Sequence, residues 1–232
     1  MNEALNKRLL ALASYVPRGK IIADIGTDHA YLPIYLVSTG IAPSAIAADV
    51  NEKPLGKARD NVSSNALTNR IDLRLGDGLQ VISPGEAQVL LIAGMGGGTI
   101  KRILQQSPQV LTDIERIIMQ PMGDEHYLRT WLINNGWKLV EETLVEEDER
   151  IYTVIVSEKG IEQLDDEIIL EVGPRLVEKN HPLLPKLLKK LIGKYHRIVH
   201  GLEKSSRPEA KARLKQVKEH ILGLEEVGKK CR

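Results

Sequence analysis

Residues 20–33 read KIIADIGTDHAYLP, and this stretch decides the fold that the sequence predicts. A short apolar run ends at an acid and a glycine, a polar turn follows, and a segment compatible with a helix begins at Tyr31. A strand, a tight turn and a helix in that order form the first unit of a nucleotide-binding α/β domain. Gly26 allows the backbone to turn sharply and to approach a ligand closely. The turn is therefore the first candidate ligand site.

The turn departs from the dinucleotide-binding pattern at Asp28, which stands where a second glycine would admit a pyrophosphate. A carboxylate at this point repels a phosphate and attracts a cation. S-adenosylmethionine carries an ammonium and a sulfonium and has no phosphate. The turn therefore favours a methyl donor over a dinucleotide, although an acid and a glycine also follow strands in many unrelated turns.

Further apolar runs repeat the strand–helix alternation along the chain. We expect strands at residues 44–50, 71–75, 89–93 and 117–120, and helices at 3–15, 53–66, 99–105 and 125–134. Residues 137–146 and 150–157 predict two strands joined by a polar turn. Parallel strands closed by an antiparallel hairpin are typical of the Rossmann-like, seven-stranded class I methyltransferase sheet, whereas the sheet of a dinucleotide dehydrogenase is all parallel.

Acids and glycines follow several of these strands. Asp49 lies about 20 residues past the first turn, where a carboxylate can accept hydrogen bonds from both ribose hydroxyls. Asp77, between Gly76 and Gly78, would face an adenine amino group, although Gly-Asp-Gly is also a common surface turn. The glycine-rich run from Gly94 follows an apolar strand directly and makes room for a ligand against the backbone.

Composition restricts the class of protein. The 232 residues include 42% hydrophobic and 27% charged residues, which is typical of a globular protein with one good-sized core. The sequence has no membrane-spanning run and begins unlike a signal peptide, so we expect a cytoplasmic protein. The single cysteine, Cys231, excludes an intrachain disulfide, and the six histidines lack metal-ligand spacing, so we predict no metal.

The C-terminal part is basic and helical. From Leu176 onward there are 15 Lys and Arg and 6 Asp and Glu, a balance of +9, which leaves −8 for the preceding residues because the whole chain carries +1. Apolar residues at alternating steps of four and three predict two helices that fold back as a coiled-coil hairpin. We therefore divide the chain into a catalytic domain at 1–160 and a basic helical domain at 161–232. The basic face predicts a polyanionic partner, although a solvated lysine-rich surface would have the same pattern.

Several motifs together resemble one family. ADIGTDHAYLP at the first turn, Asp49, GDGL from Gly76, IAGMGG from Ile92 and the segment Met119, Gln120, Pro121 resemble the bacterial TrmK family. The resemblance covers nearly the whole chain. It implies methyl transfer from S-adenosylmethionine to N1 of adenine 22 in tRNA, with tRNA as the partner of a monomer or weak dimer.

The resemblance also implies where the donor binds. It places the donor against Asp24, Gly26, Asp28 and His29, the ribose on Asp49, the adenine near Asp77 and Gly78, and the methionine part near Gly94. The expected donor-binding set also includes Asn51, Ala93 and Met95.

We expect the catalytic residues on the same first turn. Adenine N1 is already a competent nucleophile, so attack on the methyl group requires alignment more than a strong base. Asp28 or His29 would stabilise the charge that develops on the base, and Tyr31 would stack on it. The structural alternatives are that His29 caps the following helix and that Tyr31 is a core residue.

Basic residues near the site and on the tail are candidate RNA contacts. They are Lys7, Arg8, Arg129, Lys189, Lys190 and Arg197, each of which would equally serve as a surface charge. Two other functions stay open at this point. They are a donor-binding protein without catalysis, which recruits RNA or a partner protein, and a methyltransferase for a small molecule. The absence of an Asn-Pro-Pro-Tyr motif argues against an exocyclic amine as the acceptor.

Overall fold

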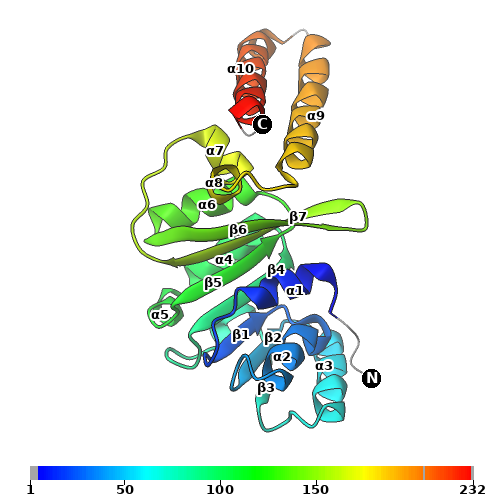
Figure 1. Cartoon of the computed structure of the whole chain (residues 1–232), viewed down its shortest axis with the longest axis vertical. Helices are drawn as coiled ribbons and strands as arrows, with labels where there is room; N and C mark the ends of the chain where they lie inside the picture. The colour runs from blue at the N-terminus through cyan, green and yellow to red at the C-terminus, as the bar shows by residue number, and fades with distance from the viewer. Residues whose placement is uncertain (1–4, 206, 231–232) are drawn as a thin grey trace. The chain divides into compact units, whose positions relative to one another are not determined.

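The computed structural model describes residues 5–205 and 207–230, and the chain divides into two compact units. One unit extends to Gln163 and the other begins at Leu164 (Figure 1). Cys231 and the first residues of the predicted N-terminal helix lie outside the described residues.

The first unit is built on a sheet of seven strands in the order β3-β2-β1-β4-β5-β7-β6. The strands are β1 (Ile22–Ile25), β2 (Ala45–Asp49), β3 (Ile71–Leu75), β4 (Val89–Met95), β5 (Arg116–Pro121), β6 (Trp137–Glu147) and β7 (Arg150–Lys159). The first five strands are parallel, and β7 is antiparallel to both β5 and β6. The predicted methyltransferase sheet, including its antiparallel hairpin, is confirmed.

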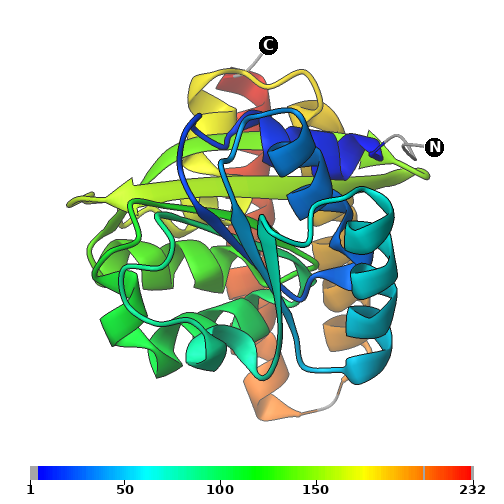
Figure 2. The same ribbon diagram turned by 90° about the horizontal axis from the view of Figure 1, so that it is seen from below.

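Helices cover both faces of this sheet (Figure 2). The helices of the unit are α1 (Lys7–Ser14), η1 (Asp28–Ala30), α2 (Tyr31–Ser38), α3 (Glu52–Ser64), η2 (Gly78–Val81), α4 (Gly97–Gln106), α5 (Pro108–Leu111) and α6 (Glu125–Asn134). The short helices η1, η2 and α5 were not predicted, because segments of three or four residues carry too little periodicity to recognise.

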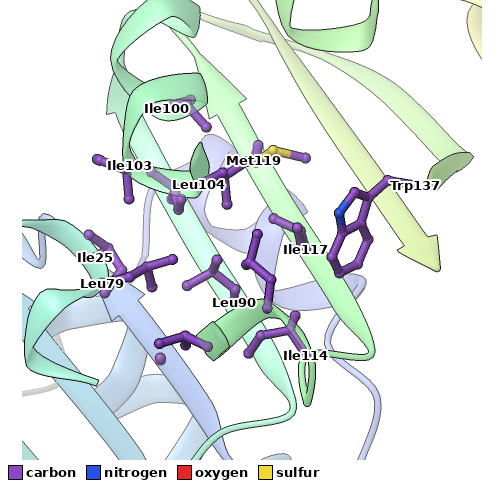
Figure 3. Close-up of a cluster of buried hydrophobic side chains, with 14 of the residues drawn as sticks. Ile25, Leu79, Leu90, Ile100, Ile103, Leu104, Ile114, Ile117, Met119 and Trp137 are labelled. Atoms are coloured by element: carbon purple, nitrogen blue, oxygen red, sulfur yellow. The ribbon is translucent and has the colours of Figure 1, made fainter. Parts of the chain in front are cut away.

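Two buried clusters hold the helices to the sheet. On one face Ile100 and Leu104 of α4 pack with Leu90, Ile117 and other strand residues (Figure 3). On the opposite face a second cluster joins apolar residues of α1, α2 and α3 to the strands. The wholly buried pattern of β1 and β2 follows from this double cover, since both faces of each strand meet apolar side chains.

The second unit consists of α7 (Glu167–Val172), α8 (Pro174–Glu178), α9 (Leu184–Glu203) and α10 (Pro208–Lys230). Figure 1 shows α9 and α10 side by side, and many residue pairs connect them. Val199 packs with Val217 and Ile221 at the centre of the pair, so the predicted helical hairpin is confirmed. The short helices α7 and α8 were not predicted.

A polar cluster also joins three helices of the second unit. The Tyr195 hydroxyl donates to Glu171 Oε1 at 2.8 Å, and His220 Nε2 lies 2.5 Å from Glu171 Oε2. Glu171 of α7 therefore contacts both helices of the hairpin.

Across the described part of the chain, no helix is both long and apolar enough for a membrane span.

Candidate active site

The carboxyl ends of the parallel strands surround a cavity of about 640 Å³. This volume lies within the roughly 300–1,000 Å³ that is typical of small-molecule sites. Every predicted donor-binding residue except His29 lines the cavity: Asp24, Gly26, Asp28, Asp49, Asn51, Asp77, Gly78, Ala93, Gly94 and Met95. They converge because the ends of neighbouring parallel strands meet at one edge of a sheet.

The turn after β1 brings the backbone close to its neighbours. Gly26 has a φ of +76°, and its amide donates to the Ala48 carbonyl at 2.8 Å. A Cβ at this position would lie 2.2 Å from Cε of Met95, across the cavity edge. The absence of a side chain at Gly26 therefore leaves room for the Met95 side chain to pack against the backbone of the turn.

The same turn contains two left-handed residues that are not glycine. His29 has a φ of 62° and Ala30 has a φ of 56°. Such conformations cost free energy in residues with a Cβ and cluster at functional sites. Asn61 of α3 supports the turn, because its Nδ2 donates to the His29 carbonyl at 2.9 Å. Asn61 was not among the predicted residues, since nothing in its local sequence indicates this contact.

Asp28, His29 and Tyr31 form one cluster at the cavity. His29 Nε2 lies 3.1 Å from Asp28 Oδ1, and its ring stacks on the Tyr31 ring with centroids 5.3 Å apart. The Tyr31 hydroxyl lies 3.4 Å from His29 Nδ1. Asp28 and Tyr31 line the cavity, whereas His29 contacts both of them without lining it. The His29 side chain makes no capping hydrogen bond to α2, which begins after Ala30.

Asp24 and Asp49 are the buried acids of the site. Burial raises the pKa of Asp24 to about 6, and the nearby Asp49 carboxylate acts in the same direction. Asp49 Oδ1 accepts a hydrogen bond from the Asn51 amide at 2.7 Å. This bond holds the Asp49 carboxylate at the end of β2, where Asp49 and Asn51 both line the cavity.

The three cations predicted near the site differ in position. Arg8 lines the cavity, whereas Lys7 is exposed and does not. The prediction that Arg129 contacts phosphate is wrong. Its side chain is 1% exposed, and its Nε donates at 2.6 Å to Glu142 Oε1 of β6, which is also buried. The inward face of α6 carries Arg129 into this ion pair, away from any approaching RNA.

Other cavity residues were not among those that the sequence predicted. They include Asn6 and Leu9 around α1, Thr99 and Arg102 of α4, and Met122 after β5. Arg102 follows the glycine run by about one helical turn, and this spacing is its one local signal in the sequence.

The residues present fit S-adenosylmethionine. The cavity edge offers carboxylates for hydroxyl and ammonium groups and a glycine-lined wall for close approach. When bound, this donor supplies a methyl group on a cationic sulfur. Within the described residues, no group of His, Cys, Asp and Glu is arranged to hold a metal ion.

Comparison with known proteins agrees with the geometry. A family model described as a methyltransferase domain matches residues 5–155. The tRNA (adenine(22)-N(1))-methyltransferase of Bacillus subtilis is 42% identical over 198 residues, which cover 82% of this chain and 83% of that protein. The crystal structure of Bacillus subtilis TrmK superposes with a TM-score of 0.90 at 35% identity and covers 97% of this chain and 98% of its own. The chain belongs to the TrmK family.

A second TrmK-like structure concerns the donor directly. A Streptococcus pneumoniae protein, solved in complex with S-adenosylmethionine, is 35% identical with a TM-score of 0.83 and covers 97% of this chain and 99% of its own. Membership of the TrmK family confirms the resemblance inferred from the motifs, and with it an S-adenosylmethionine-dependent tRNA methyltransferase.

Proposed function

We propose that the cavity binds S-adenosylmethionine along the carboxyl edge of the sheet and that the protein methylates N1 of adenine 22 in tRNA. The adenine of the donor lies near Asp77 and Gly78 after β3, and its ribose lies on Asp49, the last residue of β2. Its methionine part lies beside Gly94, near the carboxyl end of β4. One observation carries this proposal: the predicted donor contacts, which come from four separate strands, line a single cavity.

The cluster at the first turn acts on the acceptor base. Adenine N1 has a lone pair in the ring plane, so the protein must align it with the methyl group rather than deprotonate it. The base must also be unpaired, because N1 takes part in pairing within a duplex. Tyr31 stacks on the base, and Asp28, supported by His29, stabilises the positive charge that develops on the ring.

The second unit supplies the RNA contacts. Lys189, Lys190 and Arg197 of α9 are exposed, and the surrounding sequence has a strong excess of positive charge. Phosphate contacts of this kind position a nucleic acid without reading its bases. We infer that the protein is a monomer or weak dimer in the cytoplasm, and sedimentation of the free protein over a concentration series tests its oligomeric state.

The decisive measurement is transfer of labelled methyl from S-adenosylmethionine to unmodified tRNA, with the product nucleoside identified by mass and retention. We expect 1-methyladenosine, which disappears when adenine 22 of the transcript is replaced by guanine. Asp28→Asn should lower the transfer rate at saturating donor, whereas Asp165→Asn, a change of an exposed acid in the second unit, should not. Donor binding without any transfer would instead support the non-catalytic alternative.

A further inference from the structure

The segment 122–127 leads from the end of β5 into the first turn of α6, at the edge of the sheet where the cavity opens. Met122 of this segment lines the cavity and is 50% exposed. The Met122 amide donates to the Met95 carbonyl at 2.8 Å, and the Gly97 amide donates to the Gly123 carbonyl. The segment is therefore held against the end of β4 and the start of α4, which both border the cavity.

Tyr127 presents an aromatic ring to solvent in this segment. Its side chain is 67% exposed, whereas every other Tyr and Trp that the structure describes is buried or half-buried. The His126 ring meets the Tyr127 ring edge-on, with centroids 5.5 Å apart and an interplanar angle of 75°. His126 is therefore not stacked in parallel on Tyr127. An exposed ring of this kind is a stacking surface for a flat ligand.

The sheet order separates this segment from the nucleoside of the donor. β5 lies beside β4, on the side away from β2 and β3, and the proposed donor places its ribose and adenine at the ends of β2 and β3. Tyr127 does not itself line the cavity. A base that reaches the methyl group lies inside the cavity, so Tyr127 is placed to contact a part of the RNA that stays outside.

The charges at the cavity favour an RNA backbone on this same side. Arg102 of α4 lines the cavity, is exposed, and forms no hydrogen bond or ion pair with any residue that the structure describes. Helix α4 also packs against α6, which carries Tyr127. An available cation and an exposed ring on neighbouring helices are the combination that binds unpaired nucleotides. Elsewhere the cavity lining carries carboxylates, which repel phosphate: Asp24, Asp28, Asp49 and Asp77.

We propose that Tyr127 stacks on a nucleobase adjacent to adenine 22 in the tRNA. The inference rests on the proposed transfer to adenine 22. To react, adenine 22 must leave its stack and enter the cavity, which uncovers one face of a neighbouring base. The Tyr127 ring replaces the lost stacking partner and thereby stabilises the complex in which adenine 22 is swung out. Stacking of this kind accepts any base, because every base has a π-face.

The direct test uses transcripts with 2-aminopurine, whose fluorescence is quenched by stacking, at each of the two neighbours of adenine 22 in turn. Each transcript is bound to the full chain in the presence of S-adenosylhomocysteine, so that no transfer occurs. We expect Tyr127→Ala to give a higher fluorescence than the wild type for one of the two transcripts. Tyr127→Trp, which keeps an aromatic face, should leave that transcript quenched.

Kinetics supply a second readout. Tyr127→Ala should lower kcat/KM for tRNA about tenfold, within the range for losing one base stack, and Tyr127→Trp should restore most of it. Donor affinity, measured by calorimetry, should not change, because Tyr127 does not line the cavity. The salt dependence of tRNA binding should also keep its slope, since no phosphate contact is lost. Ile161→Ala is the matched control, because Ile161 is 90% exposed and lies outside the cavity lining.

The outcomes separate this inference from the proposed function. If the wild type transfers no methyl group to adenine 22, the proposed function fails and the role of Tyr127 with it. If the wild type methylates adenine 22 but Tyr127→Ala leaves both transcripts quenched, only the stacking role is overturned. A loss of activity with weaker donor binding or a smaller salt slope would likewise overturn it, in favour of structural support or a phosphate contact.

Discussion

At the scale of single residues, the site combines groups whose chemistry depends on burial. Asp24 is an ordinary acid in the sequence, but at the end of β1 it is 6% exposed and its pKa rises to about 6. Desolvation disfavours the charged carboxylate, and a bound cationic donor would offset that cost. The charged form of Asp24 is thus suited to a cationic ligand, and without such a ligand its burial costs free energy.

This burial predicts a pH dependence of stability in the ligand-free protein. The folded pKa of Asp24 exceeds its unfolded value of 3.8, so the proton is held more tightly in the folded state. Its stabilising contribution is complete below about pH 4 and is lost as the pH rises through about 6. At roughly 1.4 kcal/mol per pKa unit, the loss reaches up to about 3 kcal/mol.

Urea unfolding of the wild type and of Asp24→Asn between pH 4 and 8 measures this effect. The stability of the wild type relative to the variant should fall with rising pH up to about 6 and then stay constant, since asparagine does not titrate. Other titrating groups are common to both proteins and cancel in the difference. A constant difference across the range would show that the burial of Asp24 does not perturb its ionisation.

At the scale of elements, the first two residues of α4 show how the surroundings of adjacent glycines differ. A Cβ on Gly97 would lie 2.7 Å from the Asp124 carbonyl oxygen and 2.8 Å from that of Gly123. The amide of Gly97 also donates to the Gly123 carbonyl at 2.9 Å. The start of α4 therefore packs directly on the backbone before α6. A Cβ on Gly98, one residue later, would meet no described atom within 4 Å.

Alanine substitution should separate these two glycines. Gly97→Ala forces two backbone segments apart, so we expect a loss of about 1–3 kcal/mol in the free energy of unfolding. Gly98→Ala should be neutral or stabilising by up to about 1 kcal/mol, because alanine favours a helix over glycine. Urea midpoints of both variants test the contrast. Equal effects would mean that the close approach at Gly97 is relieved by a small backbone shift.

At the scale of the whole molecule, charge is divided between the two units. The acids that line the cavity belong to the first unit, and the basic excess belongs to the second. A tRNA methyltransferase requires both properties, because its donor is cationic in part and its other substrate is a polyanion. Because of this division, charges in one unit can be changed by mutation while the binding attributed to the other unit is measured.

Neutralising the α9 cations should therefore weaken tRNA binding without affecting the donor. We expect the combined changes Lys189→Gln, Lys190→Gln and Arg197→Gln to reduce the slope of log affinity against log salt by about 2–3, if each contacts one phosphate. Donor affinity, measured by calorimetry, should stay unchanged. Lys53→Gln, Lys57→Gln and Arg59→Gln, three exposed cations of α3, form the matched control. An equal loss of slope in that control would indicate nonspecific attraction rather than a binding surface on α9.

The fold was largely predictable because its signals are local. Apolar runs that end at glycines and acids, followed by helical periodicity, specify parallel strand–helix units without knowledge of distant residues. The same local signals placed Asp24, Gly26, Asp49 and Gly94 at strand ends, and parallel pairing then brought these ends together.

Only the tertiary structure decided which charged side chains face the cavity. Arg8 and Arg129 both lie on helices and read alike in the sequence, but α1 directs Arg8 into the site and α6 buries Arg129 against Glu142. Their partners, Gln120 and Glu142, lie on other elements, and Gln120 is 112 residues from Arg8. Sequence periodicity states which residues share a face of a helix. Which residues contact that face depends on packing between elements that are distant in the chain. This packing determines which charged side chains lie in the cavity and which are buried in ion pairs.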